Sequence, residues 1–324
     1  MNYKVIDKLI SELGKLPEVN SLSDLQVDYA EQLTYFKKAP KTYKCYQIPK
    51  NSGGFRLIAN PPFALKVVQR LLIKILEERF FISDCAHAYE KKRSIKSNAL
   101  CHVNSRFLLK MDLNNYFNSI DEDLLYSLFT RAYPEISKQE IDIINHILLW
   151  EKGTKLCLSV GAPSSPYLSN VIMYDFDEEL KSECLKRKIK FTRYADDLTF
   201  STSEREQLFQ VPHIVEELLE KYFSTKLIVN YKKTKFSSKA HNRRVTGVTL
   251  TNNGSLSLGR ERKRHIRAMV HNYFHGKSSI ENVIKLQGYL ALSKNIEPKF
   301  FNSLKEKYGN DIIPRILRVR KPDE

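Results

Sequence analysis

The chain has 324 residues, of which 42% are hydrophobic, 28% charged and 11% aromatic. This composition supports a packed core and excludes a generally disordered chain, and the length suits one large enzyme or two to three lobes sharing a core. Lys and Arg number 53 against 37 Asp and Glu, so the formal charge of +16 favours a polyanionic partner such as nucleic acid.

A membrane or secreted protein is disfavoured. No apolar run approaches the length of a membrane span, and the first 15 residues lack a signal-peptide core. The five cysteines are odd in number and contain no C-x-x-C, which argues against a disulfide framework and a thiolate zinc site. We therefore expect reduced thiols, a cytoplasmic location and no membrane partner.

The N-terminal third mixes helices with one hairpin. Residues 3–36 have helical spacing interrupted at Pro17. Residues 43–58 place aromatic and β-branched residues on both sides of Asn51-Ser52-Gly53-Gly54, which predicts a β-hairpin with Lys50 and Arg56 beside its tip. Apolar residues at helical spacing over 65–81 predict an amphipathic helix.

The middle of the chain alternates strands and helices. Residues 107–111 form an apolar strand that ends at Asp112, and helices broken at Pro134 follow over 124–150. A loop of small residues and prolines over 159–166 leads to a helix over 167–188. Residues 191–201 predict two strands joined by an acidic turn at Ala195-Asp196-Asp197.

The C-terminal part becomes helical and basic. A helix over 215–223, a strand-turn segment over 227–236 and a short strand over 244–250 precede a mostly helical region from Gly259 onward.

Three carboxylates in this order indicate metal chemistry. Asp112 and the Asp196-Asp197 pair would meet at one sheet edge if their strands are neighbours. Carboxylates that leave positions for water and phosphate are the usual Mg²⁺ ligands of polymerases, where two ions promote an in-line displacement. The alternative for Asp196-Asp197 alone is a solvated turn, because Asp is a favoured turn residue.

These residues resemble the palm motifs of reverse transcriptases over residues 43–276. The resemblance implies an α+β right-hand polymerase fold with an N-terminal helical region and fingers (1–105), a palm (106–250, with a helical insertion at about 124–160) and a helical thumb (251–324). It further implies that Asp112, Asp196 and Asp197 bind two Mg²⁺ ions, and that Phe117 is the steric gate against a 2′-hydroxyl. In isolation Phe117 would be a core aromatic.

The same resemblance assigns further substrate contacts. Lys50 and Arg56 would grip the deoxynucleotide triphosphate, for which the planar Arg fork is well suited. Gly161 and Ala162 would approach the nucleotide through their backbone. Lys233 would be catalytic, protonating pyrophosphate. The family's usual Gln before Gly161 is Val160 here, so nucleotide contacts made by that Gln do not transfer.

Two short motifs resemble those of bacterial retron reverse transcriptases. They are Asn98-Ala-Leu-Cys-His102 and Val245-Thr246-Gly247. The resemblance implies a cognate structured noncoding RNA as template, a guanosine 2′-hydroxyl as primer, a branched RNA–DNA product (msDNA), an effector protein and a role in anti-phage defence. The expected RNA-binding residues are these motif residues and basic residues of one thumb helix: Asn98, His102, Val245, Thr246, Gly247, Arg260, Arg262, Lys263, Arg264 and Arg267.

Several alternatives stay open at this point. A different bacterial reverse transcriptase, of the group II intron or diversity-generating type, would need other RNA partners. A scaffold of the same fold that binds RNA without polymerising is the rival from another class. For His102 alone, a hydrogen-bonded structural histidine is the simpler interpretation, and a basic helix is often only a solvated face.

Overall fold

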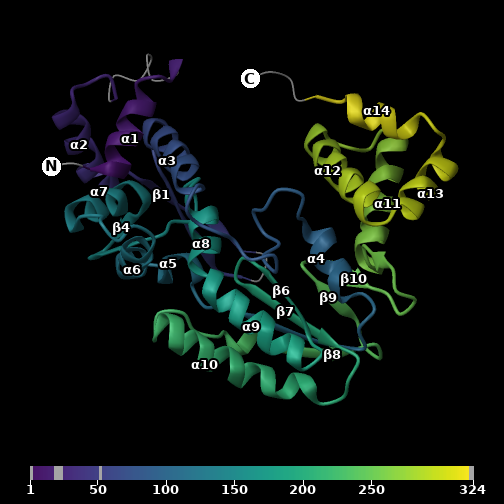
Figure 1. The fold of residues 1–324 in the computed structure, drawn as a ribbon. Coiled ribbons are helices and arrows are strands. Elements are labelled where there is room, and N and C mark those ends of the chain that lie inside the picture. Colours follow the sequence, from purple (N-terminus) through teal and green to yellow (C-terminus); the bar gives the residue numbers. More distant parts are fainter. Residues whose placement is uncertain (1–2, 18–24, 51–52, 321–324) are drawn as a thin grey trace.

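The fold is built around one four-stranded antiparallel sheet, shown near the centre of Figure 1. The computed structural model describes residues 3–17, 25–50 and 53–320. The strand order is β6-β7-β3-β8, so the two strands of the acidic hairpin lie beside the strand that ends at Asp112. The bounds are β3 Phe107–Asp112, β6 Lys190–Tyr194, β7 Asp197–Thr202 and β8 Lys235–Ser238.

Strand β3 separates two hydrophobic cores. Leu109 and Met111 point to one face and join the larger core, whereas Leu108 points to the other face and joins the smaller one. This division follows from the period of two along a strand. Both faces of β3 are therefore covered, which explains its nearly continuous apolar sequence.

The larger core also contains the helices around the sheet and the N-terminal lobe (Figure 1). Two helices pack against one another beside the sheet, α9 (Tyr174–Lys186) and α10 (Val211–Phe223), and α9 also contacts β6. The N-terminal lobe packs α1, α2, α3, α6 and α7 together. Their bounds are Lys4–Leu13, Tyr29–Lys38, Phe63–Leu76, Glu122–Ala132 and Lys138–Leu148.

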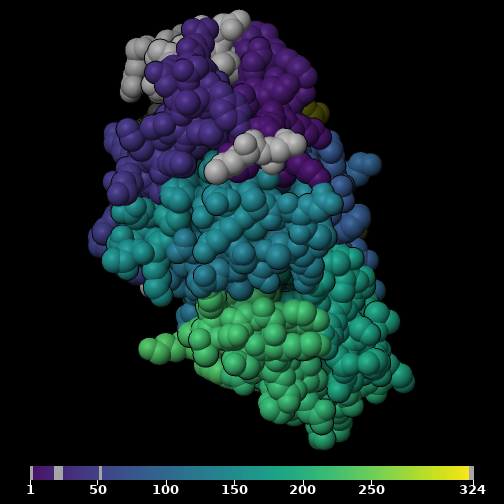
Figure 2. Space-filling model, turned by 60° about the vertical axis from the view of Figure 1, so that its left-hand side comes forward, coloured from purple at the N-terminus to yellow at the C-terminus, as the bar shows by residue number. Residues whose placement is uncertain are grey.

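Figure 2 shows one face of this arrangement, with the N-terminal helices at the top, the segment around residues 120–150 in the middle and the green segment that contains α10 at the bottom. Three shorter elements complete this part of the fold. They are the hairpin β1–β2 (Lys44–Pro49 and Phe55–Asn60), the helix α5 (Tyr116–Ser119) and the hairpin β4–β5 (Trp150–Lys152 and Lys155–Cys157).

The C-terminal lobe surrounds the smaller core. Four helices, α11 to α14, join a small sheet of order β11-β10-β9, and α4 packs against β9, β10 and β11. The bounds of these elements are α4 Ile95–His102, β9 Arg243–Val245, β10 Val248–Leu250, β11 Leu256–Ser257, α11 Arg260–Phe274, α12 Ile280–Ile296, α13 Pro298–Tyr308 and α14 Ile312–Arg318. The remaining helix, α8 (Ser165–Ile172), belongs to the central region. The lobe boundaries at 105/106 and 250/251 stay a prediction.

Most expected elements are confirmed, with local corrections. The helix expected over 65–81 ends at Leu76, and the helix expected over 167–188 is two helices that meet at Met173. The strand expected over 244–250 is two strands, because Thr246 and Gly247 adopt positive φ angles of 45° and 79° and turn the chain. The hairpin β4–β5 was not predicted. Asn51 and Ser52 of the predicted hairpin tip lie outside the described residues.

Two further observations concern membrane spans and thiols. No helix in the described part of the chain is long and apolar enough to cross a membrane. All five cysteines are described, and each carries a free thiol.

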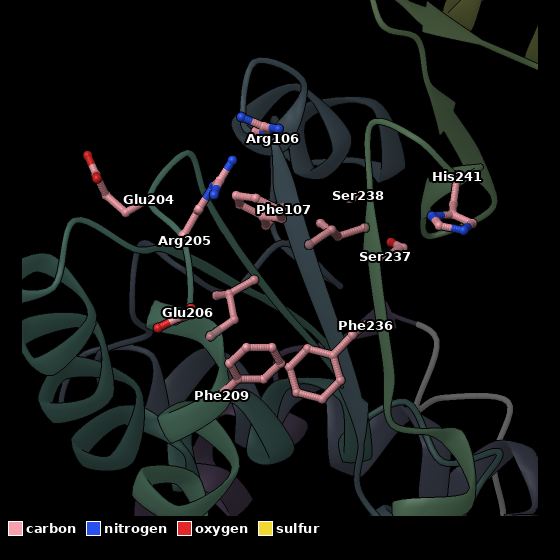
Figure 3. Close-up of a pocket in the computed structure, with 12 residues that line it drawn as sticks. Arg106, Phe107, Glu204, Arg205, Glu206, Phe209, Phe236, Ser237, Ser238 and His241 are labelled. Carbon is pink, nitrogen blue, oxygen red and sulfur yellow. The ribbon is translucent and has the colours of Figure 1, made fainter.

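A cavity of about 500 Å³ opens at the end of β3 away from Asp112 (Figure 3). Phe209 and Phe236 lie side by side there with ring centroids 5.5 Å apart, and Phe107 lies above them. Because Phe107 and Asp112 are the two ends of the same strand, this cavity is separate from the predicted carboxylate site.

Candidate active site

The three predicted carboxylates meet at one edge of the central sheet. Asp112, the last residue of β3, is the direct cross-strand partner of Asp197, the first residue of β7. Asp196 precedes Asp197 in the turn. The carbonyl oxygen of Asp196 accepts a hydrogen bond from Leu113 N at 3.1 Å. Directly opposed residues in an antiparallel pair have Cα atoms about 4.5–5.5 Å apart. The register thus brings together residues that are more than 80 positions apart.

The turn between β6 and β7 is held by a buried arginine. Ala195 has a φ of 56°, which an L-residue adopts only when its surroundings enforce it. Arg193 donates from Nη1 to Ala195 O at 3.2 Å and pairs with Asp177 of α9 at 2.6 Å, and both side chains have no exposed surface. Although burial disfavours a charged guanidinium, attraction to Asp177 raises the pKa of Arg193 above its usual value.

The carboxylates repel one another in this buried setting. Burial, followed by the charges of Asp112 and Asp197, raises the pKa of Asp196 to about 6. Burial is also the main cause that raises the pKa of Asp197. Lys233 offsets part of this charge, because its Nζ lies 2.9 Å from the Asp112 carboxylate. Asn230 Nδ2 donates to the same carboxylate at 3.1 Å.

The donor set suits a divalent cation. Three carboxylates on one sheet edge present only oxygen ligands, and the upward shift in the pKa of Asp196 shows that the site gains from added positive charge. No group of three His, Cys, Asp or Glu side chains within the described ranges is already arranged to hold a metal. In this structure Lys233 and Asn230 contact the Asp112 carboxylate oxygens.

The predicted steric gate lies close to this edge. Phe117 is half-buried in α5, five residues after Asp112, and contacts Tyr116 edge to face at a centroid distance of 5.4 Å. Tyr116 is fully buried and donates from its hydroxyl to Ser169 O at 2.8 Å. The anchored ring of Tyr116 therefore supports the Phe117 ring, while part of Phe117 stays exposed.

The loop before α8 joins the hairpin of the N-terminal lobe. Gly161 has a φ of 138°, and a Cβ at this position would lie 2.7 Å from Ala59 O of β2. Ala59 N in turn donates to Val160 O at 3.0 Å, and Ala162 is buried. Glycine is needed here for both the backbone angle and the close approach of the two segments.

The two basic hairpin residues are exposed. Lys50 precedes the tip, and Arg56 is the second residue of β2. Nothing in the fold holds either in an ion pair with a carboxylate among the described residues. Burial and the negative charge of Asp196 raise the pKa of Tyr89 in the loop before α4, and the positive charge of Arg56 opposes this shift.

The two short motifs meet although they are almost 150 residues apart. Asn98 Nδ2 donates to Thr246 Oγ1 at 3.5 Å, and Thr246 Oγ1 donates to Ile95 O at 3.4 Å. His102 contacts Ser201 Oγ and Thr192 Oγ1, each at 2.7 Å. These bonds tie α4 to the central sheet and to the turn between β9 and β10.

The burial of these motif residues corrects one prediction. Asn98, His102 and Val245 have no exposed surface, so their side chains cannot contact RNA directly in this structure. Burial, followed by the charges of His87 and Lys190, lowers the pKa of His102 to about 3. His102 is therefore a neutral structural residue that positions its neighbours.

The basic residues of α11 divide into two groups. Arg262 donates to Gly247 O at 3.1 Å, and Lys263 pairs with Glu297 at 2.9 Å, so both hold the lobe together. Arg260, Arg264 and Arg267 are exposed. Among the apolar residues of this helix, Ile266 and Val270 are buried, whereas Phe274 is 51% exposed and contacts Tyr308.

The sequence did not reveal several residues that shape the site. Asn230 follows the helix α10 by seven residues and gives no signal beyond its closeness to the predicted Lys233. The Arg193–Asp177 pair joins residues on two elements, and Tyr89 lies in a loop without a recognisable pattern. Each acts through a long-range contact that local spacing does not encode.

A central antiparallel sheet with acidic strand ends, a basic hairpin on one side and a helical lobe on the other defines a nucleotide polymerase of the right-hand class. The sequence model for "Reverse transcriptase (RNA-dependent DNA polymerase)" matches residues 48–250. The chain is 45% identical to the retron Ec83 reverse transcriptase of Escherichia coli, over 91% of this chain and 96% of that protein.

A second relative, the retron Mx65 reverse transcriptase of Myxococcus xanthus, is 32% identical over 86% of this chain and 64% of its own length. Among solved structures, a Candida albicans telomerase bound to a telomeric RNA fragment aligns with 97% of this chain and 65% of its own, at 13% identity and a TM-score of 0.48.

The chain belongs to the reverse transcriptase family and, within it, to the bacterial retron reverse transcriptases. It is an RNA-directed DNA polymerase with the right-hand fold, and its domain type implies a divalent metal cofactor. The two alternatives of a group II intron type and a scaffold without polymerase activity are thereby disfavoured.

Proposed function

We propose that this enzyme reverse transcribes a cognate structured noncoding RNA from a guanosine 2′-hydroxyl primer and releases a branched RNA–DNA product, msDNA. The observation that carries the proposal is the register that opposes Asp112 to Asp197 beside Asp196, in a chain 45% identical to a retron reverse transcriptase. Family membership supplies the template class, and the carboxylate edge supplies the chemistry.

Asp112, Asp196 and Asp197 are the residues that would hold two Mg²⁺ ions. When bound there, the ions supply positive charge for the attacking hydroxyl and for the leaving pyrophosphate. Lys233, whose Nζ lies 2.9 Å from Asp112 and whose side chain is exposed, would donate its proton to the pyrophosphate. Because the carboxylates raise the pKa of Lys233, the lysine carries that proton at neutral pH.

The substrate contacts follow from the neighbouring elements. Lys50 and Arg56 bind the triphosphate of the incoming deoxynucleotide, Arg56 with its planar fork. The Gly161-Ala162 backbone approaches the nucleotide, and Phe117 lies beneath the sugar and excludes a 2′-hydroxyl. Val160 offers the nucleotide only an apolar contact.

The RNA-binding surface includes the exposed basic residues of α11. Arg260, Arg264 and Arg267 contact phosphates of an RNA stem, whereas Arg262 and Lys263 act indirectly through their bonds within the lobe. Asn98, His102, Val245, Thr246 and Gly247 shape the turn that carries this surface. We extend the proposal to a role in anti-phage defence with an effector protein in the cytoplasm, which is what the resemblance of the two short motifs to retron enzymes implies.

Primer extension tests the enzyme. The native chain should extend a primer on an RNA template with Mg²⁺ and deoxynucleotides, and Asp196→Ala and Asp197→Ala should each abolish synthesis. Asp142→Ala is the matched control, because Asp142 is an exposed aspartate on α7 away from the sheet. Synthesis that persists in both active-site variants would refute the assignment of the carboxylates.

The retron assignment needs a separate assay. The enzyme is incubated with the structured noncoding RNA encoded beside its gene, and the product is treated with a 2′,5′ debranching enzyme. A DNA strand released by debranching supports the 2′-hydroxyl primer. Linear DNA only, from an enzyme active in primer extension, would refute that primer while leaving the polymerase intact.

The RNA surface is tested by salt dependence of RNA binding. Replacing Arg264 by Ala should weaken binding and reduce the slope of log K against log salt by about one. Lys299→Ala, an exposed cation on α13, is the control variant. An unchanged slope for Arg264→Ala would remove α11 from the interface.

A further inference from the structure

Tyr89 has an unusual backbone for an aromatic residue. It lies in the loop that precedes α4, with a φ of 65° and a side chain that is 53% exposed. A bulky L-residue avoids this left-handed region, and such strain persists only where the surroundings enforce it. An exposed ring held in a strained conformation beside a catalytic edge points to a functional position.

The loop around Tyr89 is fastened to the centre of the palm. His87 N donates to Arg193 O at 2.7 Å, and Asn170 Nδ2 donates to Ala88 O at 2.9 Å. Asn170 is fully buried and accepts from Arg193 Nη1 at 3.0 Å. The residues immediately before Tyr89 are thus fixed by the same buried arginine that holds the catalytic turn.

The ring of Tyr89 continues a row of aromatic contacts. It meets Phe117 edge to face, with centroids 6.4 Å apart and an interplanar angle of 62°. Phe117 meets Tyr116 in the same manner at 5.4 Å, and Tyr116 is anchored in the core. Phe117 therefore lies in contact with a buried ring and with an exposed one.

The surroundings of Tyr89 link the two sides of the nucleotide pocket. Burial, followed by the negative charge of Asp196, raises the pKa of the Tyr89 hydroxyl, and Arg56 opposes this shift. Asp196 belongs to the metal-binding edge and Arg56 to the hairpin expected to grip the triphosphate. The geometric link between Tyr89 and the site is the loop itself, because His87 N donates to Arg193 O on the strand that leads into the Asp196 turn.

We propose that Tyr89 is a positioning residue of the deoxynucleotide pocket, whose ring restrains Phe117 and thereby sets discrimination against ribonucleotides. A steric gate discriminates only if its ring cannot move away from an added hydroxyl. Phe117 is half-buried, and Tyr89 is the exposed ring in contact with it. The inference rests on the proposed role of Phe117 as the gate.

Kinetic discrimination between deoxynucleotides and ribonucleotides tests this role. The ratio of kcat/KM for the two substrates is measured for the native enzyme, Tyr89→Ala, Tyr89→Phe and Tyr89→Leu. An aromatic contact of this kind corresponds to roughly a tenfold change, so Tyr89→Ala should lower the ratio by about tenfold. Tyr89→Phe should keep the native ratio, and Tyr89→Leu should fall in between.

One variant background and one control substitution separate the possible outcomes. In Phe117→Ala, which by itself should lose discrimination, the further change Tyr89→Ala should have no additional effect on the ratio. Tyr126→Ala is the matched control, because Tyr126 is an exposed tyrosine on α6. Alanine at position 89 keeps a side chain at positive φ, so the substitution removes the ring without removing the backbone strain.

The results distinguish this inference from the function on which it rests. An unchanged ratio for Tyr89→Ala, together with lost discrimination in Phe117→Ala, overturns the role of Tyr89 alone. A changed KM for deoxynucleotides in Tyr89→Phe assigns the hydroxyl a direct substrate contact and also overturns the positioning role. Unchanged discrimination in Phe117→Ala overturns the gate, and no synthesis by the native chain overturns the polymerase function itself.

Discussion

Removing Asp177 should destabilise the palm far more than removing an acidic residue from the surface. Asp177 accepts from Arg193 Nε at 2.8 Å and pairs with Nη2 at 2.6 Å, and neither side chain is exposed. Asp177→Ala would leave a buried guanidinium without its counter-charge. A buried ion pair broken on one side costs about 3–5 kcal/mol, and we expect the free energy of unfolding to fall by this amount.

Urea unfolding followed by circular dichroism measures this difference. The control is Glu78→Ala, which removes an exposed pair of Glu78 with Lys8 at 2.8 Å and should cost under about 1 kcal/mol. Because Arg193 also holds Ala195 O, Asp177→Ala should reduce polymerase activity even at temperatures where the variant is folded. A loss of stability equal to that of Glu78→Ala would refute this reasoning.

Three further substitutions test the site. In the absence of metal, Asp196→Asn should raise the free energy of unfolding by about 1–3 kcal/mol at pH 8, because the folded state binds the Asp196 proton more tightly than the unfolded state does. Urea titrations at several pH values should show that this gain disappears below about pH 4. Because His102 stays neutral in the folded state, its contribution to the free energy of unfolding should be complete above about pH 6.5 and decline towards pH 3. The substitution His102→Ala should flatten that decline in acid-unfolding curves. Gly161→Ala should lower the free energy of unfolding by about 1–3 kcal/mol and raise the KM for deoxynucleotides. The control Gly288→Ala, at an open helical position, should be neutral or stabilising in thermal melts and leave KM unchanged.

The outcomes that would contradict these expectations are specific. A lower stability for Asp196→Asn at pH 8 would mean that the ionised carboxylate is favourably placed without metal. An acid-unfolding curve that His102→Ala leaves unaltered would exclude the buried imidazole as the cause of the loss of stability at low pH. Equal effects of Gly161→Ala and Gly288→Ala would show that the close approach to β2 is unimportant.

Local patterns were sufficient to predict the elements that carry the chemistry. The apolar run at residues 107–111 predicts a strand that ends at Asp112, and the β-forming residues of 191–201 predict two strands with Asp196 in the turn between them. Helical spacing predicts that the region from Gly259 onward is mostly helical, and the structure places α11 to α14 there. These predictions succeed because neighbours at i+2 on a strand and i+4 on a helix are close in space whatever the rest of the chain does.

Tertiary structure decided which of these pieces meet. The opposition of Asp112 and Asp197, the bond from Asn98 to Thr246 and the Lys233–Asp112 pair each join distant parts of the chain. The burial of His102 likewise depends on the sheet against which α4 packs. Spacing along the sequence does not encode such contacts, because they depend on the register of strands and on the packing of side chains from separate elements.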